Sequence, residues 1–331
     1  MKSMLTTMAA GVAVGLSLVG FAGPNIIFDT DMVIDFDDVG AMATLHALAD
    51  RGECNILAMA TCSRDNQSVA AVEILNAFYG RADIPVGCTL LGLSTLPSAH
   101  PLNKGMLGMH GNLAPNVKTN QCDVLIAVGM RFDDRVTGKL TSYARQAKVI
   151  HLDIDTAEIN KNVPVDVGVP GDCKKTLALL TKAVKPACHK EWIDSFQPYF
   201  DKEDAIVITP AIHPTEGPLK MGEVIRKVSE ATGDKAILVT DVGQNQMMAA
   251  RYFRFSQKRS IITSGGLGTM GFSLPAAIGA TFGAPERTVC AFMGDGGIQM
   301  NIQEFGTIME SGAPVKIILL NNNYLGNVRQ W

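Results

Sequence analysis

The sequence has little net charge and no block of basic residues. Its 331 residues include 29 lysines and arginines and 32 aspartates and glutamates, a net charge of −3. Proteins that bind nucleic acid need a basic face to neutralise phosphates, so this balance argues against a nucleic-acid partner. The seven cysteines form no C-x-x-C pair and the six histidines lack metal-ligand spacing, which argues against a disulfide framework or a zinc site.

Internal repeats and long apolar runs are also missing. The longest such run, Met8 to Ala22, follows Lys2 and is rich in small residues. It is too short for a comfortable membrane span, so we expect none. A positive start, a short apolar segment and small residues at Ala22-Gly23 are typical of a secretory signal peptide, which would imply export. A buried N-terminal helix is the alternative.

The composition that remains is that of a globular protein. Hydrophobic residues make up 47% of the chain and charged residues 18%, and the length allows two domains. Short apolar runs alternate with helical patterns, such as those over 39–50 and 68–79. The expected strands lie at residues 25–28, 55–60, 123–128, 148–152, 236–240, 288–293 and 315–320. This alternation predicts an α/β fold of parallel sheets with helices on both faces.

The clearest chemistry follows two apolar strands near the C-terminus. One strand runs into Gly294-Asp295-Gly296-Gly297, and the strand over 315–320 runs into Asn321-Asn322-Asn323. In a parallel sheet both strand ends lie at the same carboxyl edge, where ligands bind. Glycines let backbone amides approach phosphate oxygens, and a following helix N-terminus favours negative charge. An aspartate and an asparagine at adjacent strand ends can supply oxygen ligands to Mg²⁺.

This paired motif resembles the signature of thiamine-diphosphate enzymes. The resemblance implies that Asp295 and Asn322 are Mg²⁺ ligands, with the backbone carbonyl of Tyr324 as a third. Gly294, Gly296 and Gly297 would then lie against the cofactor. A loop of turn-forming residues is the alternative for an isolated Gly-Asp-Gly.

A glycine-rich segment lies upstream. Gly266-x-Gly268-x-x-Gly271 could by itself suggest a dinucleotide-binding turn, but the acidic residue expected after the next strand is lacking. Together with Thr240-Asp-Val-Gly-Gln244, this segment closely resembles acetohydroxyacid (acetolactate) synthases, although Asn245 stands where many relatives have histidine. The resemblance implies that Gln244, Gly268 and Met270 contact thiamine diphosphate.

The last residues, Leu325 to Trp331, resemble the family segment that covers the active site. Val328 and Trp331 would line the pocket for the second 2-oxoacid. A tryptophan at the position of Trp331 is the family's device for preferring 2-oxobutyrate as acceptor.

The region 88–184 resembles the second half of the FAD-binding middle domain of the same family. The resemblance rests on Gly105-Met-Leu-Gly-Met-His-Gly111, Gly129-Met-Arg-Phe-Asp-Asp-Arg-Val136 and His151-Leu-Asp-Ile-Asp155. A solvated charge cluster is the alternative for the charged residues alone. The implied flavin-pocket residues are Met109, His110, Gly111, Asp133, Arg135 and Asp153.

The family resemblance implies an activity and partners. Such an enzyme condenses pyruvate with pyruvate or 2-oxobutyrate in branched-chain amino-acid biosynthesis. It works in the cytoplasm as a homodimer with a regulatory small subunit. The sequence lacks the pyrimidine-binding domain that supplies an activating glutamate, so we expect this chain alone to be inactive or nearly so. A non-catalytic fusion that only binds thiamine diphosphate is an alternative.

The N-terminal region 24–87 has different chemistry. Carboxylates from Asp29 to Asp38 crowd together after a strand, and such repulsion is relieved by a cation such as Ca²⁺. The region resembles the start of inosine-uridine nucleoside hydrolases, which implies Asp31 as the base, Asp29 and Asp38 as Ca²⁺ ligands and Asn66 near the ribose. A solvated acidic loop and a calcium-dependent nucleoside hydrolase are the alternative interpretations.

We therefore expect a chimera of two partial proteins, joined near Ile84-Pro-Val-Gly87. The expected segments are a signal-peptide-like 1–23, a nucleoside-hydrolase-like 24–87, a partial FAD domain 88–184, a proline-bearing linker 185–218 and a thiamine-diphosphate domain 219–331.

Overall fold

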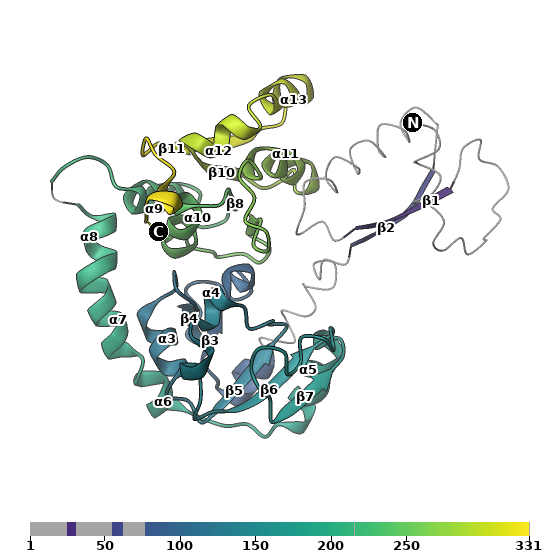
Figure 1. Cartoon of the computed structure of the whole chain (residues 1–331), viewed down its shortest axis with the longest axis vertical. Coiled ribbons are helices and arrows are strands. Elements are labelled where there is room, and N and C mark those ends of the chain that lie inside the picture. Colours follow the sequence, from purple (N-terminus) through teal and green to yellow (C-terminus); the bar gives the residue numbers. More distant parts are fainter. Residues whose placement is uncertain (1–24, 31–54, 62–76, 215, 331) are drawn as a thin grey trace. The chain divides into compact units, whose positions relative to one another are not determined.

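The computed structural model describes residues 25–30, 55–61, 77–214 and 216–330. It divides into two units, one of Met1–Met32 with Phe36–Cys62 and the other of Val33–Asp35 with Ser63–Trp331. In the first unit, β1 (Asn25–Thr30) and β2 (Asn55–Thr61) pair in parallel, as expected for both strands (Figure 1). Asp29 lies in β1. The other residues of the nucleoside-hydrolase hypothesis, Asp31, Asp38 and Asn66, lie outside the described residues, as do helix 39–50 and most of helix 68–79.

The middle part of the second unit contains two small parallel sheets. One pairs β3 (Val86–Cys88) with β4 (Asn103–Met106), and the other has the order β5-β6-β7. The three strands are β5 (Val124–Val128), β6 (Lys148–Asp153) and β7 (Val167–Pro170). Helix α3 (Leu113–Thr119) precedes β5, α4 (Asp134–Thr137) follows it, and α5 (Cys173–Ala183) follows β7. Phe78, Leu102, Leu152 and Leu177 form a buried core here. Burying these apolar side chains supplies the main driving force for this part of the fold.

The expected linker is largely helical. It forms α6 (Lys190–Asp194), α7 (Gln197–Glu203), a π-helical turn η3 (Asp204–Ile208) and α8 (Thr209–Ile212), and α7 to α8 run as one column in Figure 1. Two lysines from the middle part are buried against its aromatic rings. The ammonium of Lys118 lies 4.7 Å from the ring centroid of Trp192, and that of Lys104 lies 5.6 Å from that of Phe196. These cation–π contacts attach the linker helices to the middle part.

The C-terminal part is built on a four-stranded parallel sheet with the order β11-β10-β8-β9. The strands are β8 (Ile237–Thr240), β9 (Ile261–Thr263), β10 (Val289–Gly294) and β11 (Lys316–Leu320). The helices are α9 (Met221–Ala231), α10 (Gln244–Tyr252), α11 (Ser273–Gly283), α12 (Asp295–Met300), α13 (Glu304–Ser311) and α14 (Gly326–Gln330). The strands expected at 236–240, 288–293 and 315–320 are confirmed, whereas β9 was not expected.

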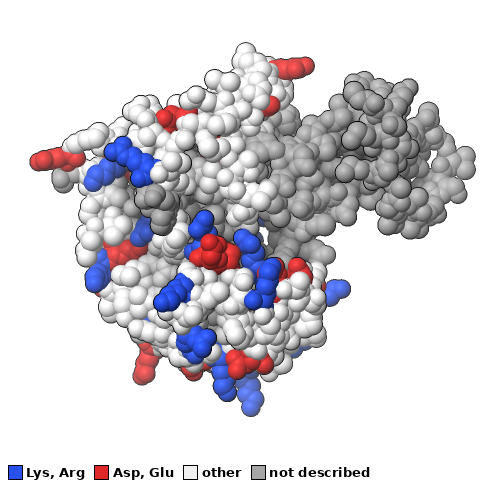
Figure 2. Space-filling model, viewed as in Figure 1, with Lys and Arg blue, Asp and Glu red and all other residues white. Residues whose placement is uncertain are grey.

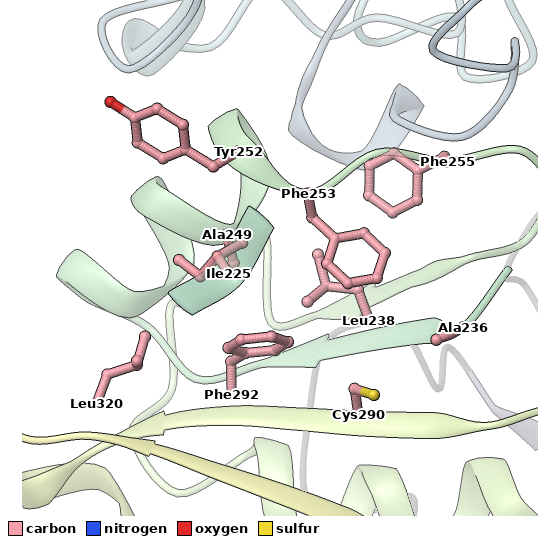
Figure 3. Close-up of a cluster of buried hydrophobic side chains, with 10 residues drawn as sticks. All are labelled: Ile225, Ala236, Leu238, Ala249, Tyr252, Phe253, Phe255, Cys290, Phe292 and Leu320. Atoms are coloured by element: carbon pink, nitrogen blue, oxygen red, sulfur yellow. The ribbon is translucent and has the colours of Figure 1, made fainter. Parts of the chain in front are cut away.

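Helices cover both faces of this sheet. On one face Leu238 and Phe292 pack against Ile225 of α9 and Ala249 of α10 in a fully buried cluster (Figure 3). Because side chains alternate along a strand, Ala291 faces the opposite side, where α11 contacts β8 and β10. The α/β class with parallel sheets and helices on both faces is therefore confirmed.

The face of the molecule shown in Figure 2 has no large patch of positive or negative charge among the described residues. Lysine and arginine side chains of the described residues lie among acidic ones there (Figure 2). Within the described ranges, no helix is long and apolar enough to cross a membrane.

Candidate active site

The carboxyl ends of three neighbouring strands form a pocket of about 100 Å³. Gly294 of β10 is in register with Leu320 of β11, and Phe292 of β10 with Thr240 of β8, so all three strands end at the same edge. The loops that leave this edge line the pocket. The expected site residues among its lining are Gln244, Met270, Gly294, Asp295, Gly296, Gly297, Asn322, Tyr324 and Val328.

The glycine turn after β10 has no room for side chains. A Cβ on Gly296 would lie 2.7 Å from the side chain of Leu325 and 3.3 Å from the terminal methyl of Met270. A Cβ on Gly297 would lie 2.0 Å from Oδ2 of Asp241. Gly296 and Gly297, in the first turn of α12, therefore allow the close approach of Leu325, Met270 and Asp241 that a larger residue would prevent. Such a turn can bring main-chain amides close to phosphate oxygens.

Gly268 is not in the pocket lining but shapes the loop that carries Met270. Its φ of +65° lies in the left-handed region, which glycine adopts without strain. A Cβ there would lie 3.3 Å from Val242, a residue of the pocket lining.

Polar side chains at the other two strand ends are held in place by hydrogen bonds. Asn322 Nδ2 donates to Gln244 Oε1 at 3.0 Å, which connects the loop after β11 to the start of α10. The Tyr324 amide donates to Asn322 Oδ1 at 3.2 Å. This network fixes the orientation of the Asn322 amide.

The chemistry of these groups fits a Mg²⁺–diphosphate complex. Asp295, Asn322 and the Tyr324 carbonyl offer one carboxylate, one amide oxygen and one main-chain oxygen, a hard-oxygen set of the kind Mg²⁺ prefers. Mg²⁺ takes few protein ligands and completes its shell with phosphate and water. No cluster of three histidine, cysteine, aspartate or glutamate side chains occurs in the part of the chain that the structure describes.

The C-terminal segment lies over the pocket. Gly326 opens α14, and a Cβ there would lie 2.5 Å from the Gln244 side chain. Val328 of α14 lines the pocket while remaining 75% exposed. Trp331, its expected partner in the substrate pocket, lies outside the described residues.

Asp241 also belongs to this edge, although the sequence alone did not single it out. It follows β8 directly, is 1% exposed, and its Oδ1 accepts a hydrogen bond from the Ser273 amide at 2.8 Å. Burial raises the pKa of this carboxyl, and hydrogen bonds from Ser273 and Gly271 oppose the rise. A carboxyl placed between an apolar strand and a Val-Gly turn is the only sign of it in the sequence.

The expected flavin residues gather in two places. The Met109 amide donates to the Arg135 carbonyl at 2.8 Å, so the loop of Met109, His110 and Gly111 lies beside the turn of Asp133 and Arg135. Asp133 caps α4 by accepting from the Arg135 amide at 3.0 Å. Burial lowers the pKa of His110, and the positive charges of Arg135 and Arg251 add to this.

Asp153 lies elsewhere, at the carboxyl end of β6. It is 1% exposed, and its Oδ1 accepts from the Asp155 amide at 2.9 Å. Arg135 is largely exposed beside Asp134, 3.3 Å away, which agrees with a partly solvated charge cluster.

Comparison with known proteins shows where this architecture recurs. Residues 241–331 match the thiamine pyrophosphate enzyme C-terminal TPP-binding domain, and residues 62–180 match the central domain of the same enzymes. The central-domain match begins upstream of the junction expected near residues 84–87, and the nucleoside-hydrolase resemblance of residues 24–87 stays a prediction.

Full-length relatives extend the comparison. The chain is 43% identical over 262 residues to the acetolactate synthase large subunit of Lactococcus lactis, covering 79% of this chain and 45% of that protein. It is 43% identical over 263 residues to the isozyme 2 large subunit of Escherichia coli, covering 79% and 46%. It is also 43% identical over 260 residues to the chloroplastic acetolactate synthase 1 of Nicotiana tabacum, covering 78% and 39%. The chain thus spans less than half the length of these relatives.

Proposed function

Because this chain belongs to the thiamine pyrophosphate enzyme family, with its central and C-terminal domains, we propose that it binds the diphosphate end of thiamine diphosphate, through Mg²⁺, at the carboxyl edge of β8, β10 and β11. We propose further that it does so as part of an acetolactate synthase, condensing pyruvate with pyruvate or 2-oxobutyrate in branched-chain amino-acid biosynthesis.

One observation carries the proposal. Residues from four separate segments, taken from the sequence as cofactor contacts, line a single pocket whose floor is a glycine turn without space for side chains. If these residues only formed turns, there would be no reason for them to line one cavity at the ends of three strands.

Each group has a distinct task in this proposal. The amides of Gly296 and Gly297 bind phosphate oxygens, and Asp295, Asn322 and the Tyr324 carbonyl hold Mg²⁺. Gln244 orients Asn322, and Met270 lies beside Gly296 where it can support the cofactor. Bound thiamine diphosphate supplies the carbanion chemistry on the 2-oxoacid, while the chain's residues bind and orient it.

We also propose FAD as a second cofactor, held by the loop of Met109, His110 and Gly111 with Asp133 and Arg135. The hydrogen bond between the Met109 amide and the Arg135 carbonyl supports this, since it brings the two segments together. Asp153 would contribute from the neighbouring sheet edge. A homodimer and a regulatory small subunit complete the proposal, and the similarity to proteins named large subunits supports the latter.

Calorimetric titration of the purified chain with thiamine diphosphate tests the proposal. We expect that thiamine diphosphate binds only when Mg²⁺ is present. Thiamine should not bind, because it lacks the diphosphate that the metal would hold. Equal binding of both compounds, or binding unchanged by a chelator, would refute it.

A further inference from the structure

Three segments that line or support the thiamine pocket converge on one buried side chain. Asp241 extends from the end of β8 with 1% of its surface exposed. Its Oδ1 accepts from the amide of Ser273, the first residue of α11, at 2.8 Å, and the backbone of Gly271 also hydrogen-bonds to it. Its Oδ2 lies against Gly297 of the glycine turn.

The loop held by Asp241 is the one that carries Met270. Met270 lies immediately before Gly271, whose φ of +82° turns the chain into α11. Asn301, after α12, donates to the Gly271 carbonyl at 2.8 Å and fastens the other side of the same loop. The Met270 methyl, on the loop held by these two contacts, lies beside Gly296, where an added Cβ would be 3.3 Å from it.

We propose that Asp241 is the positioning residue of this pocket, setting the spacing between the Met270 loop and the glycine turn that opens α12. The inference rests on the proposed function and deepens it, because that spacing determines how thiamine diphosphate fits between Met270 and the diphosphate site. Asp241 does not itself contact the cofactor; it acts through Ser273, Gly271 and Gly297.

The first test uses the full chain without any cofactor. Methionine methyl groups are labelled with ¹³C, and the Met270 signal is assigned with Met270→Leu. We expect Asp241→Ala to shift or broaden the Met270 signal, because the backbone amides of Ser273 and Gly271 lose the carboxylate that accepts their hydrogen bonds. Asp241→Asn should leave it near its original position, because the amide oxygen can still accept from Ser273. Should the alanine variant fail to fold, Asp241→Glu, which pushes the carboxyl toward Gly297, should move the same signal.

A matched control is Thr240→Val. Thr240 is the adjacent residue, equally buried, and its hydroxyl donates to Thr263 Oγ1 at 2.8 Å, at the end of β9, rather than to a group that Asp241 holds. This variant should leave the Met270 signal in place. An unmoved Met270 signal in both Asp241→Ala and Asp241→Glu would overturn the proposal, as would an equal shift in Thr240→Val.

The second test is a double-mutant cycle on Mg²⁺-dependent thiamine-diphosphate affinity. Loss of a buried hydrogen-bond acceptor predicts binding about tenfold weaker in Asp241→Ala. The same change should weaken binding less in a Met270→Ala background, because the group that Asp241 positions is already gone. Equal losses in both backgrounds would mean a general structural role and refute the proposal. Absence of binding by the unmodified chain would refute the proposed function, whereas the methionine spectra would still decide the role of Asp241.

Discussion

The ion pair between Glu203 and Arg251 joins the helical linker, the middle part and the C-terminal part of the chain. Glu203 ends α7 and accepts hydrogen bonds from Arg251 Nη2, from Asn112 Nδ2 at 3.3 Å and from the Leu113 amide at 3.1 Å. Arg251, near the end of α10, also donates to the Gly111 carbonyl at 3.0 Å. The pair lines a cavity of about 360 Å³. It therefore connects the helical linker and the proposed flavin loop to the helix that starts at the thiamine pocket.

Replacing Glu203 by glutamine removes the charge and keeps the shape. The Glu203 side chain is 4% exposed and that of Arg251 19%, so Arg251 would face a neutral amide in a largely desolvated position. Removing one partner of a buried pair costs about 3–5 kcal/mol. Because Arg251 keeps some solvent and glutamine keeps a hydrogen-bonding oxygen, we expect Glu203→Gln to lower the free energy of unfolding by about 2–3 kcal/mol.

Urea unfolding followed by tryptophan fluorescence measures this change, since Trp192 of α6 lies in the same helical segment as Glu203. The matched control is Asp194→Asn, which breaks the exposed pair between Lys190 and Asp194, with side chains 75% and 58% exposed. That loss should stay below about 0.5 kcal/mol. Equal losses in the two variants would refute the reasoning. Replacing Glu203 and Arg251 together by methionine should recover part of the stability, because no charge is then left unpaired.

Four further predictions concern the site and the buried thiols. Asp295→Asn should weaken Mg²⁺-dependent thiamine-diphosphate binding about tenfold or more in calorimetry, because the metal loses its carboxylate ligand. The control Glu310→Gln, on exposed α13, should leave the affinity unchanged. Equal affinities of the two variants would contradict the assignment. Gly297→Ala should lower the melting temperature by its clash with Asp241, and adding Asp241→Ala should restore part of it; strictly additive losses would contradict the clash. Burial raises the pKa of Cys88 to about 12 from an ordinary 9.0 and that of Cys290 to about 11. Iodoacetamide at about pH 8 should therefore label exposed Cys188 in the folded chain and leave these two unmodified, and equal labelling of all three would contradict their burial. Stability should fall as pH rises from 9.0 toward about 12, because the unfolded thiol of Cys88 loses a proton that the folded one retains.

Long apolar strands that end in turn residues could be read from the sequence. The strand expected at 288–293 is shifted by one residue from β10, and that expected at 315–320 begins one residue before β11, because strands of a parallel sheet are continuous apolar runs. β9 and β7 were not expected. The first has three residues, and the second contains Gly168 and Pro170, which weaken a strand pattern and suit an edge position.

The linker illustrates how one residue type can signal opposite structures. Its prolines marked it as a candidate linker, and in the structure Pro198 and Pro210 lie in the first turns of α7 and α8. Proline is compatible with a first turn, where its missing amide has no partner to lose. The sequence cannot distinguish these two uses of proline without knowledge of what the helix packs against.

The site was predictable where residues after strands form a recognisable paired motif, and not where the role of a residue depends on tertiary contacts. Asp295 and Asn322 could be paired because parallel strand ends share an edge. Asp241 could not be recognised, because its role depends on burial and on contact with Gly297. The link between Glu203 and Arg251 likewise depends on tertiary packing, since the two residues are 48 positions apart.

Crystallography of the chain grown with Mn²⁺ and thiamine diphosphate tests the central claim most directly, because Mn²⁺ replaces Mg²⁺ at oxygen sites and scatters anomalously. We predict an anomalous peak between Asp295, Asn322 and the Tyr324 carbonyl, with the diphosphate against Gly296 and Gly297. A diphosphate bound elsewhere, or a metal peak away from these three oxygens, would contradict the account.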